Sequence, residues 1–375
     1  MSLPTVEEIT AKLAEVIDPE IRRPITELEM VRSVEISKDG KATIGIDLTT
    51  AGCPLRDSIS SDVERTLLTM DGITAVEVCI GVMNDEQRAK LKQTLRGGVP
   101  ERQIPFAQPG SLTRVYAISS GKGGVGKSSM TVNLATAMAQ DGLKVGIVDA
   151  DIYGFSIPQM MGVTNPPQVV DNMIIPPVAH DVKVISIGMF MEENTPVVWR
   201  GPMLHRALEQ FFADVFWGDL DALLIDLPPG TGDIAISVAQ LIPNAEIIVV
   251  TTPQSAAAEV AERAGMMAKQ TNQRVLGVIE NMSYLVSPDG TKIELFGKGG
   301  GATLAAQLST LLEYEVPQLA QVPLEQPLRE GGDAGTPLAI QAGNSVAQEE
   351  IRKVAQQLAS RARGLSGRSL SVAPL

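Results

Sequence analysis

The sequence predicts an α/β protein in which a large domain, with a mainly parallel sheet and helices on both faces, follows a small α+β domain. From Arg114 onward, short apolar runs alternate with helical stretches, which is typical of βαβ units. Before that point, strands of period 2 lie between amphipathic helices. A stretch rich in glycine and proline separates the two parts. The length of 375 residues also suits more than one domain.

The small domain is expected over residues 1–95. Its first helix ends near Asp18-Pro19, because proline disfavours helix in the residue before it. Apolar and polar or small residues alternate over residues 42–48, which predicts a half-buried strand. A second helix from about Pro54 and a second strand over residues 76–82 complete the domain.

Residues 96–111 are expected to form a linker, since glycines and prolines recur there almost without periodicity. The large domain follows over residues 112–362, and a flexible Gly/Ser-rich tail over residues 363–375. The predicted strands of the large domain are Val115–Ile118, Val145–Val148, Val184–Ile187, Leu223–Ile225, Ile247–Val250 and Val275–Ile279.

Composition narrows the classes of function. The chain has 44 acidic and 31 basic residues, a net charge of -13, which does not favour nucleic-acid binding. Its longest apolar runs, such as Ile247–Val250, are far shorter than a membrane span, so we expect no membrane association and a cytoplasmic protein. Two cysteines, Cys53 and Cys79, suit a reducing compartment. Two histidines are too few for a histidine-rich zinc site.

A glycine-rich loop is the strongest signal in the chain. Residues 121–128 read GKGGVGKS, a full match to GxxxxGK[ST], between a predicted strand and a helix that ends near Gly142. Glycines let successive backbone N–H groups point at phosphate oxygens, and the helix N-terminus favours negative charge. The sequence therefore predicts ATP bound with Mg²⁺, where Lys127 pairs with β/γ oxygens and the Ser128 hydroxyl binds the metal. The candidate nucleotide-binding residues here are Gly121, Lys122, Gly123, Gly124, Val125, Gly126, Lys127, Ser128 and Ser129.

Carboxylates follow two of the predicted strands. Asp226 ends the apolar run Leu223–Ile225, where an aspartate that binds Mg²⁺ is expected after a P-loop. Asp149 and Asp151 follow Val145–Val148. One of the two carboxylates can lie near the metal while the other positions the attacking water. The alternative is that both are polar loop residues.

Lys122 is not required for cradling phosphate within one chain. Its charge can reach phosphates across a dimer interface, in the manner of an arginine finger, or it is a solvent-exposed loop lysine.

These residues resemble a known family. KGGVGKS at Lys122–Ser128 is similar to the KGGxGK[ST] motif of the deviant Walker A ATPases. The chain further resembles the Mrp/ApbC family of iron–sulfur cluster carrier ATPases, and its first 95 residues resemble the iron–sulfur assembly domain often fused in front of them. The motifs of the ATPase part are SSGKGGVGKS, DADIYGFSIP, WRGPM at Trp199–Met203, DLPPGTGD at Asp226–Asp233, ENMS at Glu280–Ser283 and FGKGGG at Phe296–Gly301. Those of the first part are IDPE at Ile17–Glu20 and LTTAGCPLRDSI at Leu48–Ile59.

The resemblance implies an ATP-hydrolysing homodimer that sandwiches two ATP molecules. It also implies that the dimer assembles or transfers iron–sulfur clusters, with apo iron–sulfur proteins and cluster assembly factors as partners. Lys122 would reach the opposite nucleotide, Asp151 would help position water, and Asn281 would lie near the adenine. The expected catalytic residues are then Lys122, Lys127 and Asp151, and the expected Mg²⁺ ligands are Ser128, Asp149 and Asp226.

The chain departs from the family at the cluster site. Carriers of this kind place a CxxC pair soon after ENMS, so that two chains bind one [4Fe–4S] cluster, but residues 284–290 here contain no cysteine. A cluster binds elsewhere, or ligands other than thiolate hold it, or the ATPase works without one. Cys53 is the candidate substitute as a cluster or sulfur ligand, because its place at a helix start favours the thiolate. An inert, buried Cys53 is the alternative, and Cys79 shows no motif.

Two other functions fit the same motifs. One is a cluster-independent, nucleotide-switched ATPase of the partition or positioning type. Its membrane-bound members need an amphipathic C-terminal helix with bulky apolar residues, which residues 359–366 do not provide. The other is a small-molecule kinase, which would form a product other than ADP and phosphate.

Overall fold

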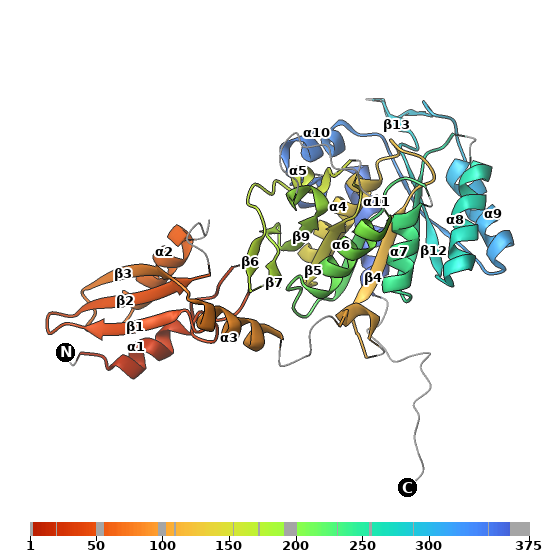
Figure 1. Ribbon diagram of the computed structural model, residues 1–375. Coiled ribbons are helices and arrows are strands. Elements are labelled where there is room, and N and C mark those ends of the chain that lie inside the picture. Colours follow the sequence, from red (N-terminus) through yellow and green to blue (C-terminus); the bar gives the residue numbers. More distant parts are fainter. Residues whose placement is uncertain are drawn as a thin grey trace, which may run out of the picture. The chain divides into compact units, whose positions relative to one another are not determined.

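The computed structural model describes residues 3–19, 21–49, 56–96, 103–108, 110–152, 154–171, 173–190, 201–230, 232–254, 257–287, 289–343 and 345–360. The chain divides into two compact units (Figure 1). The N-terminal unit contains residues 1–103 together with residues 165–178 and 213–218, and the C-terminal unit contains residues 104–164, 179–212 and 219–375. Cys53 and the expected tail, residues 363–375, lie outside the described residues.

The N-terminal unit is built on a three-stranded sheet of order β1-β2-β3. β1 (Val31–Ile36) pairs antiparallel with β2 (Lys41–Leu48), which pairs parallel with β3 (Ala75–Val82). The helices are α1 (Val6–Leu13), α2 (Arg56–Leu67) and α3 (Asp85–Arg96). α2, β2 and β3 lie where the sequence predicts a helix and two strands. α1 lies in the predicted first helix but ends at Leu13, so the predicted end near Asp18-Pro19 is wrong. β1 and α3 are additions that the pattern does not predict.

The C-terminal unit contains an eight-stranded sheet of order β15-β12-β11-β4-β10-β5-β9-β8. The pairs from β15 to β9 are parallel, which confirms the predicted mainly parallel sheet. The strands are β4 (Arg114–Ser119), β5 (Val145–Asp149), β8 (Val178–Ala179), β9 (Val182–Ser186), β10 (Ala222–Asp226), β11 (Glu246–Thr251), β12 (Val275–Asn281) and β15 (Gln318–Val322).

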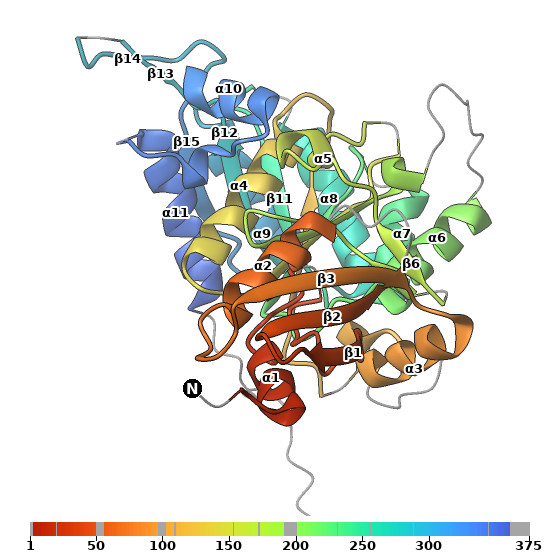
Figure 2. The same ribbon diagram turned by 90° about the vertical axis from the view of Figure 1, so that its left-hand side faces the viewer.

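Helices cover both faces of this sheet. α4 and α11 lie on one side and α7 and α8 on the other (Figure 2). The helices are α4 (Lys127–Gln140), α5 (Ile157–Met160), α6 (Gly201–Ala213), α7 (Asp233–Leu241), α8 (Ala257–Thr271), α9 (Gly300–Leu312), α10 (Gln326–Ala334) and α11 (Val346–Ala359). Three short 3₁₀ turns, η1 (Pro105–Ala107), η2 (Ile187–Phe190) and η3 (Leu338–Ile340), complete the helical elements of the described chain.

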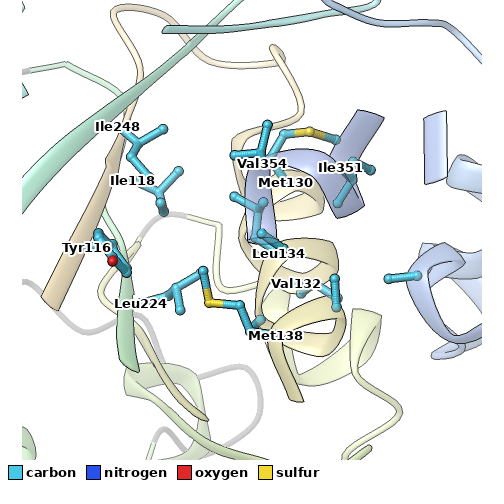
Figure 3. Packing of buried hydrophobic residues seen from close by; sticks show 14 of the residues in the cluster. Tyr116, Ile118, Met130, Val132, Leu134, Met138, Leu224, Ile248, Ile351 and Val354 are labelled. Atoms are coloured by element: carbon cyan, nitrogen blue, oxygen red, sulfur yellow. The ribbon is translucent and has the colours of Figure 1, made fainter. Parts of the chain in front are cut away.

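The core under α4 fixes the helix that follows the glycine-rich loop. Met130, Leu134 and Met138 of α4 pack against Ile118 of β4 and Leu224 of β10, and α11 closes the same cluster (Figure 3). All five side chains are fully buried. Since burying one such side chain is worth about 1.5–3 kcal/mol, this face anchors α4 firmly at the end of β4.

The boundaries of the two units differ from the sequence prediction in two places. The expected linker, residues 96–111, already contains η1, where Phe106 is 1% exposed and its carbonyl accepts a 3.0 Å hydrogen bond from Asn244 Nδ2. The predicted large domain over residues 112–362 is also interrupted, because residues 165–178 and 213–218 belong to the N-terminal unit. The reason is packing: apolar residues of both segments join the core of that unit.

Candidate nucleotide-binding site

The glycine-rich loop joins the central strand β4 to α4, as the motif predicts. Gly124 and Gly126 have φ angles of +76° and +79°, a conformation that side chains with a Cβ adopt only at a cost. A Cβ on Gly126 would lie 2.2 Å from Asn281 Nδ2, and one on Gly121 would lie 2.5 Å from Val260 Cγ2. The loop therefore requires glycine both for its backbone angles and for the space around it.

Three side chains of α4 converge on Asp226, which is fully buried at the end of β10. Lys127 Nζ donates to Asp226 Oδ2 at 2.7 Å, and the Ser128 hydroxyl donates to the same oxygen at 2.6 Å. The Thr131 hydroxyl donates to Oδ1 at 2.7 Å. Asp226 thus lies at the N-terminal end of α4, with the positive charge of the Lys127 ammonium beside it.

Asp149 lies beside Asp226 because β5 and β10 pair in parallel with these two residues in register. Its carboxylate is fully buried and accepts hydrogen bonds from the Ser186 hydroxyl at 3.0 Å and from the backbone N–H of Asp151 at 3.2 Å. Burial, with the nearby charge of Asp226, raises the pKa of Asp149 to about 8. Burial therefore favours the protonated form of Asp149.

Asp151 follows on the same loop and is 7% exposed. One of its oxygens accepts a 3.1 Å hydrogen bond from the backbone N–H of Gly154, and the other lies 3.8 Å from Lys127 Nζ. The carboxylates of Asp151 and Asp226 therefore both lie within reach of the Lys127 ammonium, as expected for residues around one phosphate group.

Lys122 makes a contact that the sequence does not predict. Its ammonium donates to the side-chain oxygen of Gln254, in the loop after β11. Within the described chain, Lys122 is thus held against its own subunit rather than extended away from it.

Asn281 ends β12 and supports the glycine-rich loop. Its Nδ2 donates to the Val125 carbonyl at 2.9 Å, while its Oδ1 is buried and has no hydrogen-bond partner among the residues that the structure describes. An unpaired buried acceptor is costly, so this oxygen is available to a donor on a bound molecule. The prediction that Asn281 lies near the adenine stays a prediction, although its contact with the loop places it beside the nucleotide-binding segment.

The ENMS and FGKGGG motifs meet at the start of α9. Glu280, 1% exposed, accepts hydrogen bonds from the backbone N–H of Gly301 at 2.5 Å and from Gln321 Nε2 at 3.0 Å. A Cβ on Gly300 would lie 2.6 Å from the Pro253 carbonyl oxygen. These glycines therefore allow α9 to approach the sheet so closely that the Glu280 carboxylate lies at the positive N-terminus of the helix.

The segment in which the family places its CxxC pair forms a short hairpin. β13 (Leu285–Val286) pairs antiparallel with β14 (Lys292–Ile293). Cys79 is exposed on β3, at the edge of the other sheet. No group of three or more histidine, cysteine or acidic side chains in the described part of the chain is arranged to hold a metal ion. The predicted role of Cys53 falls outside the described residues.

The sequence misses several residues that complete the site. Thr131 lies one helical turn after Lys127, so the spacing of α4 alone would have indicated it. Ser186 lies beside Asp149 only because β9 pairs with β5 in that register. The contact of Gln254 with Lys122 depends on the path of a loop after β11, which no local pattern specifies.

Two parts of the chain match models of known protein families. Residues 111–359 match the model of the ParA family, described as NUBPL iron-transfer P-loop NTPase. The chain belongs to this family. Residues 6–79 match a second model, described as iron-sulfur cluster assembly protein. Two predictions, a P-loop NTPase unit and an assembly-type domain before it, are thus confirmed.

Individual relatives cover nearly the whole chain. It is 59% identical over 98% of its length to a protein named iron-sulfur cluster carrier protein from Mycobacterium tuberculosis, covering 96% of that protein. A Synechocystis protein of the same name is 39% identical over 95% of this chain and 98% of its own length. Among solved structures, a nucleotide-binding protein from Archaeoglobus fulgidus in complex with ADP is 33% identical, with a TM-score of 0.53, over 69% of this chain and 94% of that one.

No helix in the described ranges is both long and apolar enough to span a bilayer.

Proposed function

We propose that this protein binds ATP with Mg²⁺, hydrolyses it as a homodimer and uses the cycle to carry iron–sulfur clusters to apoproteins. The observation that carries the proposal is the convergence of Lys127, Ser128 and Thr131 on the buried Asp226. Two relatives are named iron-sulfur cluster carrier protein, which supports an iron–sulfur cluster as the cargo. The Archaeoglobus protein is in complex with ADP, which supports an adenine nucleotide as the ligand.

The donor set fits Mg²⁺. Ser128 and Asp226 offer a hydroxyl and a carboxylate oxygen within 2.6 Å of each other, the hard ligands that Mg²⁺ prefers. We assign these two residues to the metal, and Asp149 as the further carboxylate next to them. A bound Mg²⁺ would supply charge that neutralises the phosphate oxygens.

The residues of this chain then have distinct roles. Lys127 would leave Asp226 for the phosphate oxygens when nucleotide binds, because the phosphates carry more negative charge than one carboxylate. Asp151 is proposed to orient the attacking water. Lys122 is proposed to exchange its contact with Gln254 for the phosphates bound by the partner subunit, which completes the site only in the dimer.

Cluster transfer tests the function directly. Protein purified without oxygen is reconstituted with iron and sulfide and mixed with an apoprotein, with and without ATP and Mg²⁺. We expect visible absorption of a bound cluster and activation of the apoprotein. Cys53→Ser and Cys79→Ser separate the thiols: loss only in Cys53→Ser locates the ligand. Absence of a cluster in the wild type would exclude the carrier function and favour a nucleotide-switched ATPase.

A further inference from the structure

The two oxygens of the Asp226 carboxylate receive hydrogen bonds from different turns of α4. Lys127 Nζ and the Ser128 hydroxyl, in the first turn of the helix, both donate to Oδ2, at 2.7 and 2.6 Å. The Thr131 hydroxyl donates to Oδ1 at 2.7 Å from one turn further along. In the proposed function, both groups on Oδ2 have a second task, on phosphate and on Mg²⁺. Thr131 has no such task, so its contact does not have to break when nucleotide binds.

The hydroxyl proton of Thr131 has two acceptors within reach. Its Oγ1 lies 3.0 Å from the Lys127 carbonyl oxygen and 2.7 Å from Asp226 Oδ1. A hydroxyl has one proton, and a hydrogen bond to an ionised acceptor is shorter and stronger than one to a neutral acceptor. The distances therefore assign the proton to the carboxylate. The Lys127 carbonyl is also the acceptor for the backbone N–H of Thr131 in the helix, so it does not depend on the hydroxyl.

The backbone of Asp226 is fixed on both sides, which leaves the side-chain torsion as its remaining freedom. Asp226 pairs with Ile118 of β4 on one side and with Asp149 of β5 on the other. Its carbonyl accepts the backbone N–H of Ala150 at 3.0 Å. The torsion about the Cβ–Cγ bond of an aspartate has broad minima, so backbone pairing alone does not decide which oxygen lies beside Ser128. A donor on Oδ1 decides it.

The surroundings of Thr131 suit this task. Thr131 and Asp226 are both 0% exposed, so water does not compete for either group. The neighbouring Met130 and Leu134 are fully buried where α4 packs on β4 and β10 (Figure 3). Threonine is also stiff about its first side-chain torsion, because it is branched at Cβ. The hydroxyl and the carboxylate are therefore carried by two elements whose separation is set by the core.

We propose that Thr131 is a positioning residue: its hydroxyl holds Asp226 Oδ1, so that Oδ2 stays beside Ser128 as a ligand for Mg²⁺. Hydrogen bonds to a ligating carboxylate orient it, and the loss of such a partner typically weakens metal binding by about 10–100-fold. The inference rests on the proposed binding of ATP with Mg²⁺. It requires neither hydrolysis, nor a dimer, nor an iron–sulfur cluster.

Binding of a ribose-labelled, fluorescent, non-hydrolysable ATP analogue to the full chain tests the inference without hydrolysis. Its dissociation constant is measured in EDTA and at increasing Mg²⁺ concentrations, and the concentration that gives half of the strengthening reports the affinity for the metal. Thr131→Val removes the donor while keeping the branched shape. We expect it to raise this concentration by about tenfold or more. Its affinity in EDTA should stay close to that of wild type, because the glycine-rich loop and Lys127 are unchanged.

Three further variants separate the hydroxyl from the shape and from the helix. Thr131→Ser keeps the hydroxyl and should respond to Mg²⁺ like wild type. Thr131→Ala removes the donor with a residue of high helix propensity, so it gives the measurement even where Thr131→Val does not fold. Thr136→Val is the matched control and should respond like wild type. Thr136 is also fully buried on α4, but its hydroxyl donates to the Val132 carbonyl of its own helix, at 2.9 Å.

An unchanged response to Mg²⁺ in either variant without the Thr131 hydroxyl would overturn the inference. An equal loss in Thr131→Ser would also overturn it, because the effect would then come from the shape of the side chain. The same holds for an equal loss in Thr136→Val, which would trace the effect to the stability of α4. A wild type that does not bind the analogue at any Mg²⁺ concentration would instead refute the proposed function, on which the inference depends.

Discussion

Gly124 and Gly126 show how two residues with the same backbone conformation carry different constraints. Both have positive φ, but a Cβ on Gly124 meets nothing within 4 Å, whereas one on Gly126 would lie 2.2 Å from Asn281 Nδ2. Gly124→Ala should therefore cost only the left-handed backbone, about 1–2 kcal/mol. Gly126→Ala should cost about 1–3 kcal/mol more, for the steric conflict. Urea-induced unfolding of the two variants checks this, and equal losses would contradict the role of Asn281.

Asp149 gives the stability of the nucleotide-free protein a dependence on pH. Its pKa rises from 3.8 to about 8 on folding, so between these values the folded state binds more protons than the unfolded state. The free energy of unfolding should then fall as pH rises from about 4 to about 8, by up to about 1.4 kcal/mol per pH unit. Asp149→Asn should lack this contribution.

The measurement is the difference in unfolding free energy between wild type and Asp149→Asn across this pH range, in EDTA and without nucleotide. A difference that stays constant, or that grows in favour of the wild type as pH rises, would show that the Asp149 carboxylate is not held protonated.

At the level of elements, α9 depends on a carboxylate that belongs to another element. Glu280→Gln replaces an acceptor oxygen by an amide donor, which cannot serve Gly301 N–H together with Gln321 Nε2 and the Ser283 hydroxyl. We expect the free energy of local unfolding at the start of α9 to fall by about 1.5–3 kcal/mol, the contribution of a hydrogen bond to a charged group. Hydrogen exchange of the first amides of α9 measures it. Glu315→Gln, an exposed change beyond the other end of α9, should leave them unaffected.

Local patterns predict the long elements of this fold well. The apolar runs around Val115–Ile118 and Ile247–Val250 are buried on both faces of a parallel sheet. Strands of this kind are almost continuously apolar, so the sequence predicts them directly. β15 is not predicted, because the polar Gln318 and Gln321 interrupt its apolar residues. The strands β6 (Gln168–Val170) and β7 (Met173–Ile175) are not predicted, because three residues are too few to show a period. The P-loop and Asp226 follow from motif and strand position, whereas Ser186 and Gln254 require the strand order and loop path.

At the scale of the whole molecule, the N-terminal unit includes residues 165–178 and 213–218, which lie within the sequence of the other unit. A domain boundary predicted from glycine and proline content does not reveal this. The buried Val170 and the exposed Val169 are adjacent on β6. Val170→Asp should destabilise the N-terminal unit by about 3 kcal/mol or more, because it buries an unpaired charge in the core that contains Ile9 and Ile46. Val169→Asp should cost about 1 kcal/mol or less.

Hydrogen exchange over α1 and β2 distinguishes the two changes. Faster exchange there only in Val170→Asp would show that residues 165–178 stabilise the N-terminal unit. Equal protection in both variants would mean that the unit folds without it.

The central claim is that the loop from Gly121 to Ser128 binds the phosphates of ATP so that the site can hydrolyse it. Release of phosphate from ATP with Mg²⁺ tests it most directly, in wild type, Lys127→Ala and the control Lys298→Ala, whose side chain is 81% exposed. We predict phosphate release by wild type and by Lys298→Ala, and a loss of about tenfold or more in Lys127→Ala, the factor expected for one charge-assisted hydrogen bond. Equal phosphate release by Lys127→Ala and wild type would contradict the account.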